Sequence, residues 1–558
     1  MLPKITAHRK HPFSTGSPKR DIDLPGPKHM NNVLFTKSDF YRRDRRELAR
    51  VPTLGESEIC SRGNESVMSS QFLPILRLLK ASTTAISDED LKEIANNRSL
   101  QKIFLQDCKN LTDVGAFSST LTLEEMHLRG CSKLVSIGDI GQLPLLWLLD
   151  LSKTSVTDND LKSLSGSKSL LKIFLEDCKN LTAIDFLSSI TSIEEISIRG
   201  CHKVKHIGSL GLLSALHTLD VSKISINNSG LLGLGASRSL EKIFLENCKQ
   251  LSNVSTFSSI RSLREIYLSR CVRLTSVDTL GTLPALCVLD ASKTSLTDEG
   301  LEGLSASRSL EKIILEDCVC LACVSALSYI ISLKEIYLSG CTLISEIGVL
   351  GLLPALCVLD ASKTSLTDEG LEGLSASRSL EKIILEDCVC LTCVSELSSV
   401  MSLKELRLRG CNRLTIVSGL GLLPDLCALD LSMTAVTGVS LRGLGESPSL
   451  SKLFLENCLN LTSVQSLSTV LALEEIYLRG CVRVSDVGAL GALPVLQLLD
   501  VSKTSVTDEG LDGLSASLTL KRILLEDCAK LTTVASLTYV HTIEEMNVCG
   551  CSGVTSFI

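Results

Sequence analysis

One cysteine position recurs through this chain at fixed spacings, and it constrains the fold more than any other feature. Cys271 follows Cys248 by 23 residues, Thr294 follows after another 23, and Cys318 follows after 24. The unit is therefore 70 residues long and consists of three repeats. The fourteen cysteines at this position are Cys108, Cys131, Cys178, Cys201, Cys248, Cys271, Cys318, Cys341, Cys388, Cys411, Cys458, Cys481, Cys528 and Cys551.

The residues around each cysteine show what the repeat is. Residues 239–254 follow the pattern L-x-x-L-x-L-x-x-C-x-x-L, in which Ile243 and Leu245 alternate with polar or exposed positions. This alternation predicts a short, half-buried strand. Such a strand cannot bury its apolar face alone, so it needs a copy of itself on each side, as in a solenoid.

The motif followed by TDEGLxxL resembles the cysteine-containing class of leucine-rich repeats, best known from F-box substrate-adaptor proteins. The three-repeat cadence, with GCxxLxxIGxLGxLPxLxxLDxS from Gly340 to Ser362, is similar to leucine-rich repeat proteins of trypanosomatid parasites. The resemblance covers residues 71–558. It implies an α/β leucine-rich repeat solenoid, a horseshoe with a parallel concave sheet and about 21 repeats.

Residues 1–70 lack the periodicity and are predicted to form a disordered basic N-terminal arm. Residues 1–50 hold twelve Lys or Arg and five Asp or Glu, a charge of +7, so the total of -7 leaves -7 minus 7, or -14, for the rest. The acidic array argues against nucleic acid as a partner. The Arg42–Arg46 cluster is either a nuclear-targeting signal or, more simply, a solvated charge run.

The cysteine count bears on the cellular compartment. The chain has 23 cysteines, an odd number spread over its length, so a disulfide framework is not expected. Buried free cysteines favour a reducing, cytoplasmic environment. The sequence MLPKITAHRKHPFS shows no secretory signal, and no apolar run reaches the roughly 20 residues of a membrane span. The glycosylation-type motifs at Asn110 and Asn180 are expected to be by-products of the repeat consensus.

The chain offers few candidates for chemistry. The denser cysteine groups at 318–323 and 388–393 lack the four well-spaced ligands of a zinc site, and no metal or cofactor is expected. No catalytic motif stands in a fitting context. Residues 283–321 and 353–391 are identical letter for letter, which argues against a unique catalytic site in the middle of the array.

The third repeat type should carry a helix on the convex side. In the segment from Thr294 to Leu310, Thr297 is a candidate N-cap, and Asp298 and Glu299 suit the first turn of a helix. The other two repeat types are rich in Ser and β-branched residues and predict loops or single 3₁₀ turns.

The residues that point out of the strands form the candidate binding site. Acidic and aromatic residues dominate this predicted concave face: Asp150, Asp220, Asp290, Asp360, Asp430, Asp500, Phe174, Phe244, Phe454, Tyr267, Tyr337 and Tyr477. Exposed aromatics among charges are typical of protein interfaces. A simpler interpretation is that each Asp of the LDxS motif caps its own backbone.

The sequence therefore predicts a non-enzymatic scaffold or receptor that binds a protein partner on its concave face. Two alternatives stay open: a substrate adaptor of a ubiquitin ligase, and a surface or secreted recognition protein. The array also ends in CSGVTSFI without a polar cap, so two interpretations stay open for this end: oligomerisation through it, or a short frayed tail.

Overall fold

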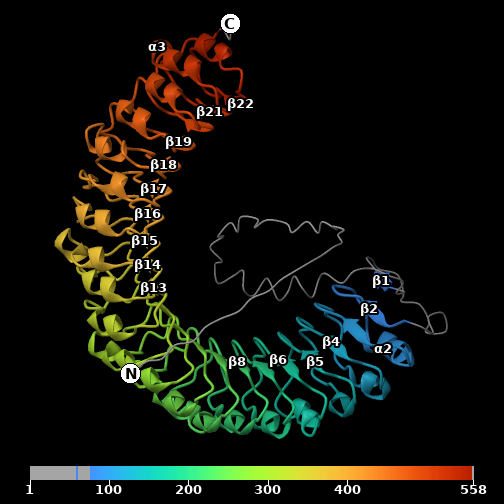
Figure 1. The fold of residues 1–558 in the computed structure, drawn as a ribbon. Coiled ribbons are helices and arrows are strands. Elements are labelled where there is room, and N and C mark those ends of the chain that lie inside the picture. The colour runs from blue at the N-terminus through green and yellow to red at the C-terminus, as the bar shows by residue number, and fades with distance from the viewer. Residues whose placement is uncertain (1–57, 61–75, 556–558) are drawn as a thin grey trace, which may run out of the picture. The chain divides into compact units, whose positions relative to one another are not determined.

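The computed structural model describes residues 58–60 and 76–555. These residues fold as a leucine-rich repeat solenoid whose strands line the concave side and whose short helices lie on the convex side (Figure 1). The described residues contain a parallel sheet of 22 strands, of which β2–β22 are the 21 strands of the regular array. The predicted fold class is confirmed.

The three strands of each 70-residue unit recur in a fixed order. First-type strands are β3 (Lys102–Phe104), β6 (Lys172–Phe174), β9 (Lys242–Phe244), β12 (Lys312–Ile314), β15 (Lys382–Ile384), β18 (Lys452–Phe454) and β21 (Arg522–Leu524). Second-type strands are β4 (Glu125–His127), β7 (Glu195–Ser197), β10 (Glu265–Tyr267), β13 (Glu335–Tyr337), β16 (Glu405–Arg407), β19 (Glu475–Tyr477) and β22 (Glu545–Asn547). Third-type strands are β2 (Leu78–Lys80), β5 (Leu148–Asp150), β8 (Thr218–Asp220), β11 (Val288–Asp290), β14 (Val358–Asp360), β17 (Ala428–Asp430) and β20 (Leu498–Asp500).

Consecutive strands pair without any shift in register. Ile243 pairs with Ile266, and Ile266 pairs with Leu289, so equivalent residues of successive repeats lie side by side. The middle residue of each strand points into a continuous apolar core, and the residues on either side of it point out. Equivalent residues three strands apart are therefore about 14 Å apart, three times the usual strand spacing of about 4.8 Å.

One further strand, β1 (Glu58–Cys60), pairs in parallel with β2. It lies inside the range 1–70 that the sequence assigns to the arm. The rest of that range, with the arginine cluster, lies outside the described residues, so the arm stays a prediction.

The cysteine position is buried in every repeat, and its thiol has a definite partner. Cys178 Sγ donates to Leu151 O at 3.2 Å, and Cys201 Sγ donates to Leu175 O at 3.0 Å. In third-type repeats the hydroxyl of Thr154 donates to Leu151 O at 2.7 Å. Cysteine and threonine at this position thus both donate to a buried carbonyl, whereas Ile224 fills the equivalent place in its repeat with an apolar side chain. Burial raises the pKa of the Cys131 thiol to about 12, so it stays protonated.

The convex side differs in part from the prediction. First-type and second-type repeats carry short 3₁₀ helices, as expected: Gly115–Ser119, Ile140–Gln142, Asp185–Ser189, Gly208–Leu212, Ser255–Ser259, Asp278–Thr282, Ser325–Tyr329, Gly348–Leu352, Ser395–Ser399, Leu420–Leu422, Gln465–Thr469, Gly488–Ala492 and Ala535–Tyr539. Third-type repeats form an α-helix only at α2 (Asp88–Ile94) and α3 (Asp508–Leu511). The others form 3₁₀ helices: Asp160–Leu164, Asn228–Leu231, Leu234–Ala236, Glu299–Ala306, Glu369–Leu371, Leu374–Ala376 and Ser440–Leu444, and Asp512–Ala516 follows α3.

The acidic residue of the TDEG motif has a role that the sequence did not suggest. Asp298 Oδ1 accepts hydrogen bonds from the backbone of the next repeat, at 2.8 Å from Ala322 N and 2.9 Å from Cys323 N. Thr297 Oγ1 accepts from Gly300 N at 3.3 Å, as expected of a cap. The aspartate therefore links neighbouring repeats in addition to favouring the helix start.

The two identical segments differ in local structure. Glu299–Ala306 is one continuous 3₁₀ helix, whereas the equivalent residues form Glu369–Leu371 and Leu374–Ala376, separated by Gly373 with φ +94°. Gly303 N donates to Asp278 Oδ1 at 3.2 Å, and the residue that stands 70 positions after Asp278 is Gly348, which has no side chain to accept. The two segments thus differ in one contact to the preceding repeat.

The residue before the cysteine or threonine is left-handed in all 21 repeats of the described array, with φ between 53° and 80°. The chain turns here from the concave strand back into the core. Second-type repeats mostly use glycine, and a Cβ on Gly340 would lie 2.2 Å from Asp317 Oδ1. Glycine is needed there for space as well as for φ.

Replacing Gly340 with alanine tests this double requirement. Gly340→Ala should destabilise its repeat by more than the about 1–2 kcal/mol of a left-handed L-residue, because Asp317 must also move. Gly166→Ala is the matched control: its φ is +91°, and nothing lies within 4 Å of its Cβ position. Amide hydrogen exchange of the flanking strands would measure both effects. Equal losses in the two variants would show that the close contact contributes nothing.

Candidate functional site

The third residues of the strands form one row along the concave face, here called the concave row. It contains every residue of the predicted binding site. In β9, β10 and β11 these residues are Phe244, Tyr267 and Asp290, which are direct register partners. The structure therefore brings the aromatic and acidic columns together, and the order Phe–Tyr–Asp occurs at β9–β11 and again at β18–β20.

The aspartates of the row are engaged with their own backbone. Asp150 Oδ1 accepts from Ser152 N at 2.9 Å, and Asp360 Oδ1 accepts from Ser362 N at 3.0 Å. The same contact occurs at Asp220, Asp290, Asp430 and Asp500. Exposure is 0% for Asp290 and 5% for Asp220 and Asp500, whereas the other three are partly exposed. The simpler interpretation of LDxS thus describes these contacts, and partner binding by the aspartates stays a prediction.

The aromatic residues form stacked pairs across neighbouring strands. Ring centroids are 4.7 Å apart in Phe244–Tyr267 and in Phe454–Tyr477, with interplanar angles of 12° and 8°. Phe104 stacks in the same way on His127, at 4.4 Å. The predicted aromatics are only half-buried, so each pair presents ring edges to solvent in a fixed orientation. Phe174 differs, because its register partner is Ser197.

Ion pairs hold each aromatic pair from one side. Lys242 Nζ lies 2.6 Å from Glu265 Oε2 and 5.2 Å from the centroid of Phe244. Glu265 Oε2 also accepts from Tyr267 Oη at 2.8 Å. The lysine–glutamate pair recurs on six adjacent first-type and second-type strands: Lys102–Glu125, Lys172–Glu195, Lys242–Glu265, Lys312–Glu335, Lys382–Glu405 and Lys452–Glu475. Here these six pairs are called the Lys–Glu ladder.

The ladder shifts the pKa of its tyrosines. Burial, followed by hydrogen bonding to Glu475 and the charge of that carboxylate, raises the pKa of Tyr477 to about 12. The tyrosine therefore stays a neutral donor to glutamate over the whole physiological range. The sequence analysis did not identify the ladder, although its signal, a Lys and a Glu 23 residues apart in six units, is present in the sequence.

A second set of ion pairs crosses the third-type strand. Arg129 Nη1 lies 2.7 Å from Glu176 Oε2, and Arg479 Nη1 lies 2.8 Å from Glu526 Oε2, in each case 47 residues apart. Arg199–Glu246 and Arg409–Glu456 are equivalent, at 3.6 and 3.3 Å. In the middle of the array the arginine is replaced by Ser269 and Ser339. The middle of the concave face is consequently more acidic than its ends.

The denser cysteine groups at 318–323 and 388–393 include side chains on the surface. Cys320 and Cys323 are exposed, and Cys323 Sγ donates to Ser325 Oγ at 3.2 Å. No group of three or more His, Cys, Asp or Glu residues in the described ranges is arranged to hold a metal ion. Within the same ranges, no helix is long and apolar enough to cross a membrane.

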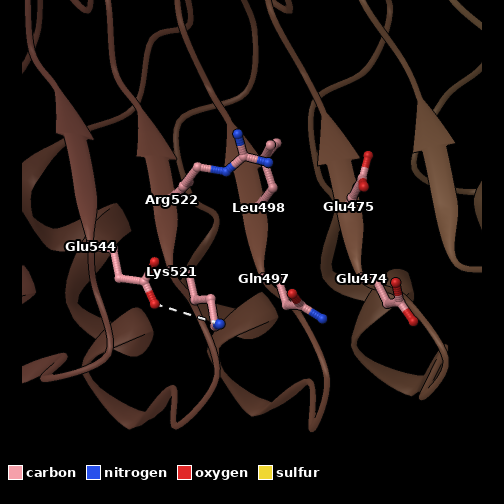
Figure 2. Close-up of a pocket in the computed structure, with 7 residues that line it drawn as sticks. All are labelled: Glu474, Glu475, Gln497, Leu498, Lys521, Arg522 and Glu544. Atoms are coloured by element: carbon pink, nitrogen blue, oxygen red, sulfur yellow. Dashed lines mark ion pairs between the residues drawn. The ribbon is translucent and has the colours of Figure 1, made fainter.

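A small hollow opens on the concave face across β19, β20, β21 and the residue before β22 (Figure 2). Its volume is about 170 Å³, and it is lined by Glu474, Glu475, Gln497, Leu498, Lys521, Arg522 and Glu544. Sequence reasoning did not single out these residues, because they stand at the start of the strands and not in the concave row.

Comparison with known proteins agrees with the fold. No protein-family model matches the chain. It is 27% identical over 182 residues to a proposed adenylate cyclase regulatory protein of Trypanosoma equiperdum, which covers 32% of this chain and 29% of that protein. It is also 27% identical over 338 residues to a proposed disease resistance protein of Arabidopsis thaliana, 59% of this chain and 28% of that protein. The chain thus spans less than a third of the length of either relative.

Solved structures are similar in fold only. A Toll-like receptor, TLR13, in complex with single-stranded RNA has a TM-score of 0.56, with 18% identity over 85% of this chain and 75% of that chain. A leucine-rich repeat protein of Leptospira interrogans has a TM-score of 0.50, with 17% identity over 77% of this chain and 97% of that chain. The chain therefore has the leucine-rich repeat fold.

Placing an arginine at position 339, where the array has a serine, tests how much the ion pairs that cross the third-type strand contribute to stability. Burial and the carboxylates of Asp430 and Asp360 raise the pKa of Glu386, against the opposing effect of Arg407. Because the pKa of Glu386 is raised in the folded state, ionisation of its carboxyl costs folding free energy. That stability is lost as the pH rises through the folded-state pKa. Ser339→Arg, 47 residues before Glu386, should lower this pKa, so its gain in stability should be present at pH 7 and absent at pH 3.

Denaturant unfolding of the full chain at both pH values would measure the gain. The double variant Ser339→Arg/Glu386→Gln is the control, because it keeps the arginine and removes the carboxylate. An equal gain in the double variant would contradict the ion-pair explanation.

Proposed function

We propose that the protein is a non-enzymatic recognition scaffold that binds a protein partner on its concave face. The observation that carries this proposal is the set of half-exposed, stacked aromatic pairs, each anchored by a lysine–glutamate pair. Two such pairs, Phe244–Tyr267 and Phe454–Tyr477, stand at corresponding places in their units. Tyr337 is held in the same manner by Glu335, at 3.0 Å.

The physical reason for binding lies in the rigidity of these groups. Each ring is fixed by stacking and each tyrosine hydroxyl by a carboxylate, so contact with a partner immobilises few side chains. Tyrosine is also enriched among residues that dominate the energy of protein interfaces. The flanking ion pairs supply the polar rim that excludes other partners.

Similarity to known proteins supports a recognition role and leaves the partner open. The names of the trypanosome and plant relatives describe regulation and resistance, and the chain matches only part of each. The TLR13 structure contains RNA. The charge of -14 outside residues 1–50 of this chain, from -7 in total and +7 in that segment, instead favours a protein partner.

The aromatic residues provide a sharper test than the aspartates. Charge reversal at Asp220 or Asp290 would break backbone hydrogen bonds and disturb the fold. A hot-spot ring contributes about 2 kcal/mol, which is about thirtyfold in affinity, so the double variant Tyr267→Ala/Tyr337→Ala should weaken partner binding by at least that factor. Proximity labelling with the full chain, followed by binding measurements with the labelled partner, would show this.

Two tyrosines on the convex side are a matched control. Tyr329 and Tyr539 are exposed by 65% and 70% and lie on 3₁₀ helices away from the strands. Tyr329→Ala/Tyr539→Ala should leave the partners unchanged. Loss of binding in this control, or an unchanged partner list in the concave variant, would refute the concave-face proposal. Circular dichroism would confirm that both variants are folded.

We also infer that the protein acts in a reducing compartment, as in the cytoplasm. The 22 cysteines of residues 76–555 are all free, and fourteen of them hold the repeat position in the core. The asparagines of two glycosylation-type motifs already make hydrogen bonds to the preceding repeat. Asn110 Nδ2 donates to Ala85 O and Asn180 Nδ2 donates to Ser155 O, both at 3.2 Å. A glycan attached at these nitrogens would crowd the neighbouring repeat.

The protein from its native source should therefore show no change in mobility after treatment with an N-glycosidase. Asn110→Gln and Asn180→Gln should likewise leave the mobility unchanged. A shift that these substitutions abolish would instead support the surface or secreted alternative.

A further inference from the structure

The Lys–Glu ladder is interrupted at β21. The residue at the ladder position is Arg522, and its register partner on β22 is Glu545. No ion pair or hydrogen bond of the Arg522 guanidinium occurs within the described residues. Figure 2 shows the reason: the guanidinium extends over Leu498 of β20, on the side away from β22.

β21 also differs from the other first-type strands in the residue before the strand. In the other units a neutral or acidic residue precedes the ladder lysine: Gln101, Leu171, Glu241, Glu311, Glu381 and Ser451. Before Arg522 stands Lys521, so two cations are adjacent here. Lys521 Nζ lies 3.5 Å from Glu544 Oε1, with both side chains more than half exposed, which makes this pair weak.

The acidic residues of the hollow do not neutralise Arg522. Glu475 already receives Lys452 Nζ at 2.9 Å and Tyr477 Oη at 2.9 Å. Glu544 faces Lys521 (Figure 2). The guanidinium thus lies at the wall of a hollow of about 170 Å³, large enough for one small polar group, with Leu498 beneath it.

We propose that this hollow is a subsite for a single carboxylate, the side chain of an Asp or Glu of the protein partner, bound by Arg522. This step rests on the proposed function of the concave face. A guanidinium matches a carboxylate with two parallel hydrogen bonds, which a lysine cannot reproduce. Gln497 and Lys521, which directly precede β20 and β21, line the other end of the hollow (Figure 2).

The surrounding charges select a carboxylate over a phosphate. Glu474, Glu475 and Glu544 all line the hollow, so a doubly charged group meets more repulsion than a singly charged one. The same carboxylates disfavour a nucleic acid backbone.

A small probe tests the subsite without the partner. N-acetylglutamate N-methylamide, which carries only the side-chain carboxylate, should give a saturable shift of the Arg522 Nε–H signal in the full chain labelled with ¹⁵N-arginine. The neutral analogue N-acetylglutamine N-methylamide should give none, and inorganic phosphate should bind more weakly than the glutamate probe. The Arg522 signal is identified by its absence in Arg522→Lys.

The variants separate recognition from folding. Arg522→Lys restores the residue type of the other six units, so the fold should be retained while affinity for a partner falls at least about tenfold. Arg483→Lys, at an exposed arginine outside the hollow, is the matched control and should change neither quantity.

Absence of a saturable shift, equal shifts with the glutamine analogue, or tighter binding of phosphate would each overturn the subsite. These results are independent of the tyrosine variants. If the glutamate probe does not bind but the Tyr267 and Tyr337 substitutions still weaken partner binding, the subsite alone is rejected. If those substitutions do not weaken partner binding, the concave-face proposal as a whole is rejected.

Discussion

The structure depends on parallel pairing of three-residue strands with no shift in register. Such a strand has one inward side chain, so the stability of each repeat comes mainly from its two neighbours. Every position must then suit the equivalent positions before and after it. This explains why the buried cysteines and threonines all donate to a backbone carbonyl, and why the residue preceding them is left-handed throughout the described array.

The same register organises the concave face. Because the side chains of successive strands lie side by side, a Phe, a Tyr and an Asp on three strands become one row, and a Lys and a Glu on two strands become an ion pair. The chemical character of the surface therefore repeats about every 14 Å. Residues that depart from the repeat, such as Ser197, Ser339 and Arg522, mark the places where the surface differs from the equivalent places in the other units.

Features that depend on the spacing of apolar residues were predicted well from the sequence. The number of repeats, the inward cysteines and the concave row all follow from leucine spacing, because burial leaves only one side for those residues. The stacked rings and the Lys–Glu ladder could not be predicted from single positions, since they depend on contacts between strands 23 residues apart. The convex helices were predicted only in part: identical residues form one helix at 299–306 and two at 369–376, so the local sequence alone does not fix the conformation.

The two identical segments have a consequence for the evolution of the protein. Residues 283–321 and 353–391 form equivalent strands, and each strand meets its neighbours through the same register. If residues 283–352 were removed, Thr282 would be joined to Leu353. The residues after this junction are identical to those that follow Thr282 now, so no contact between neighbouring repeats would be new to the molecule. Recombination between the copies can thus shorten or lengthen the array by whole units. The length of the concave surface can then change in evolution by whole 70-residue units, without any new contact between repeats.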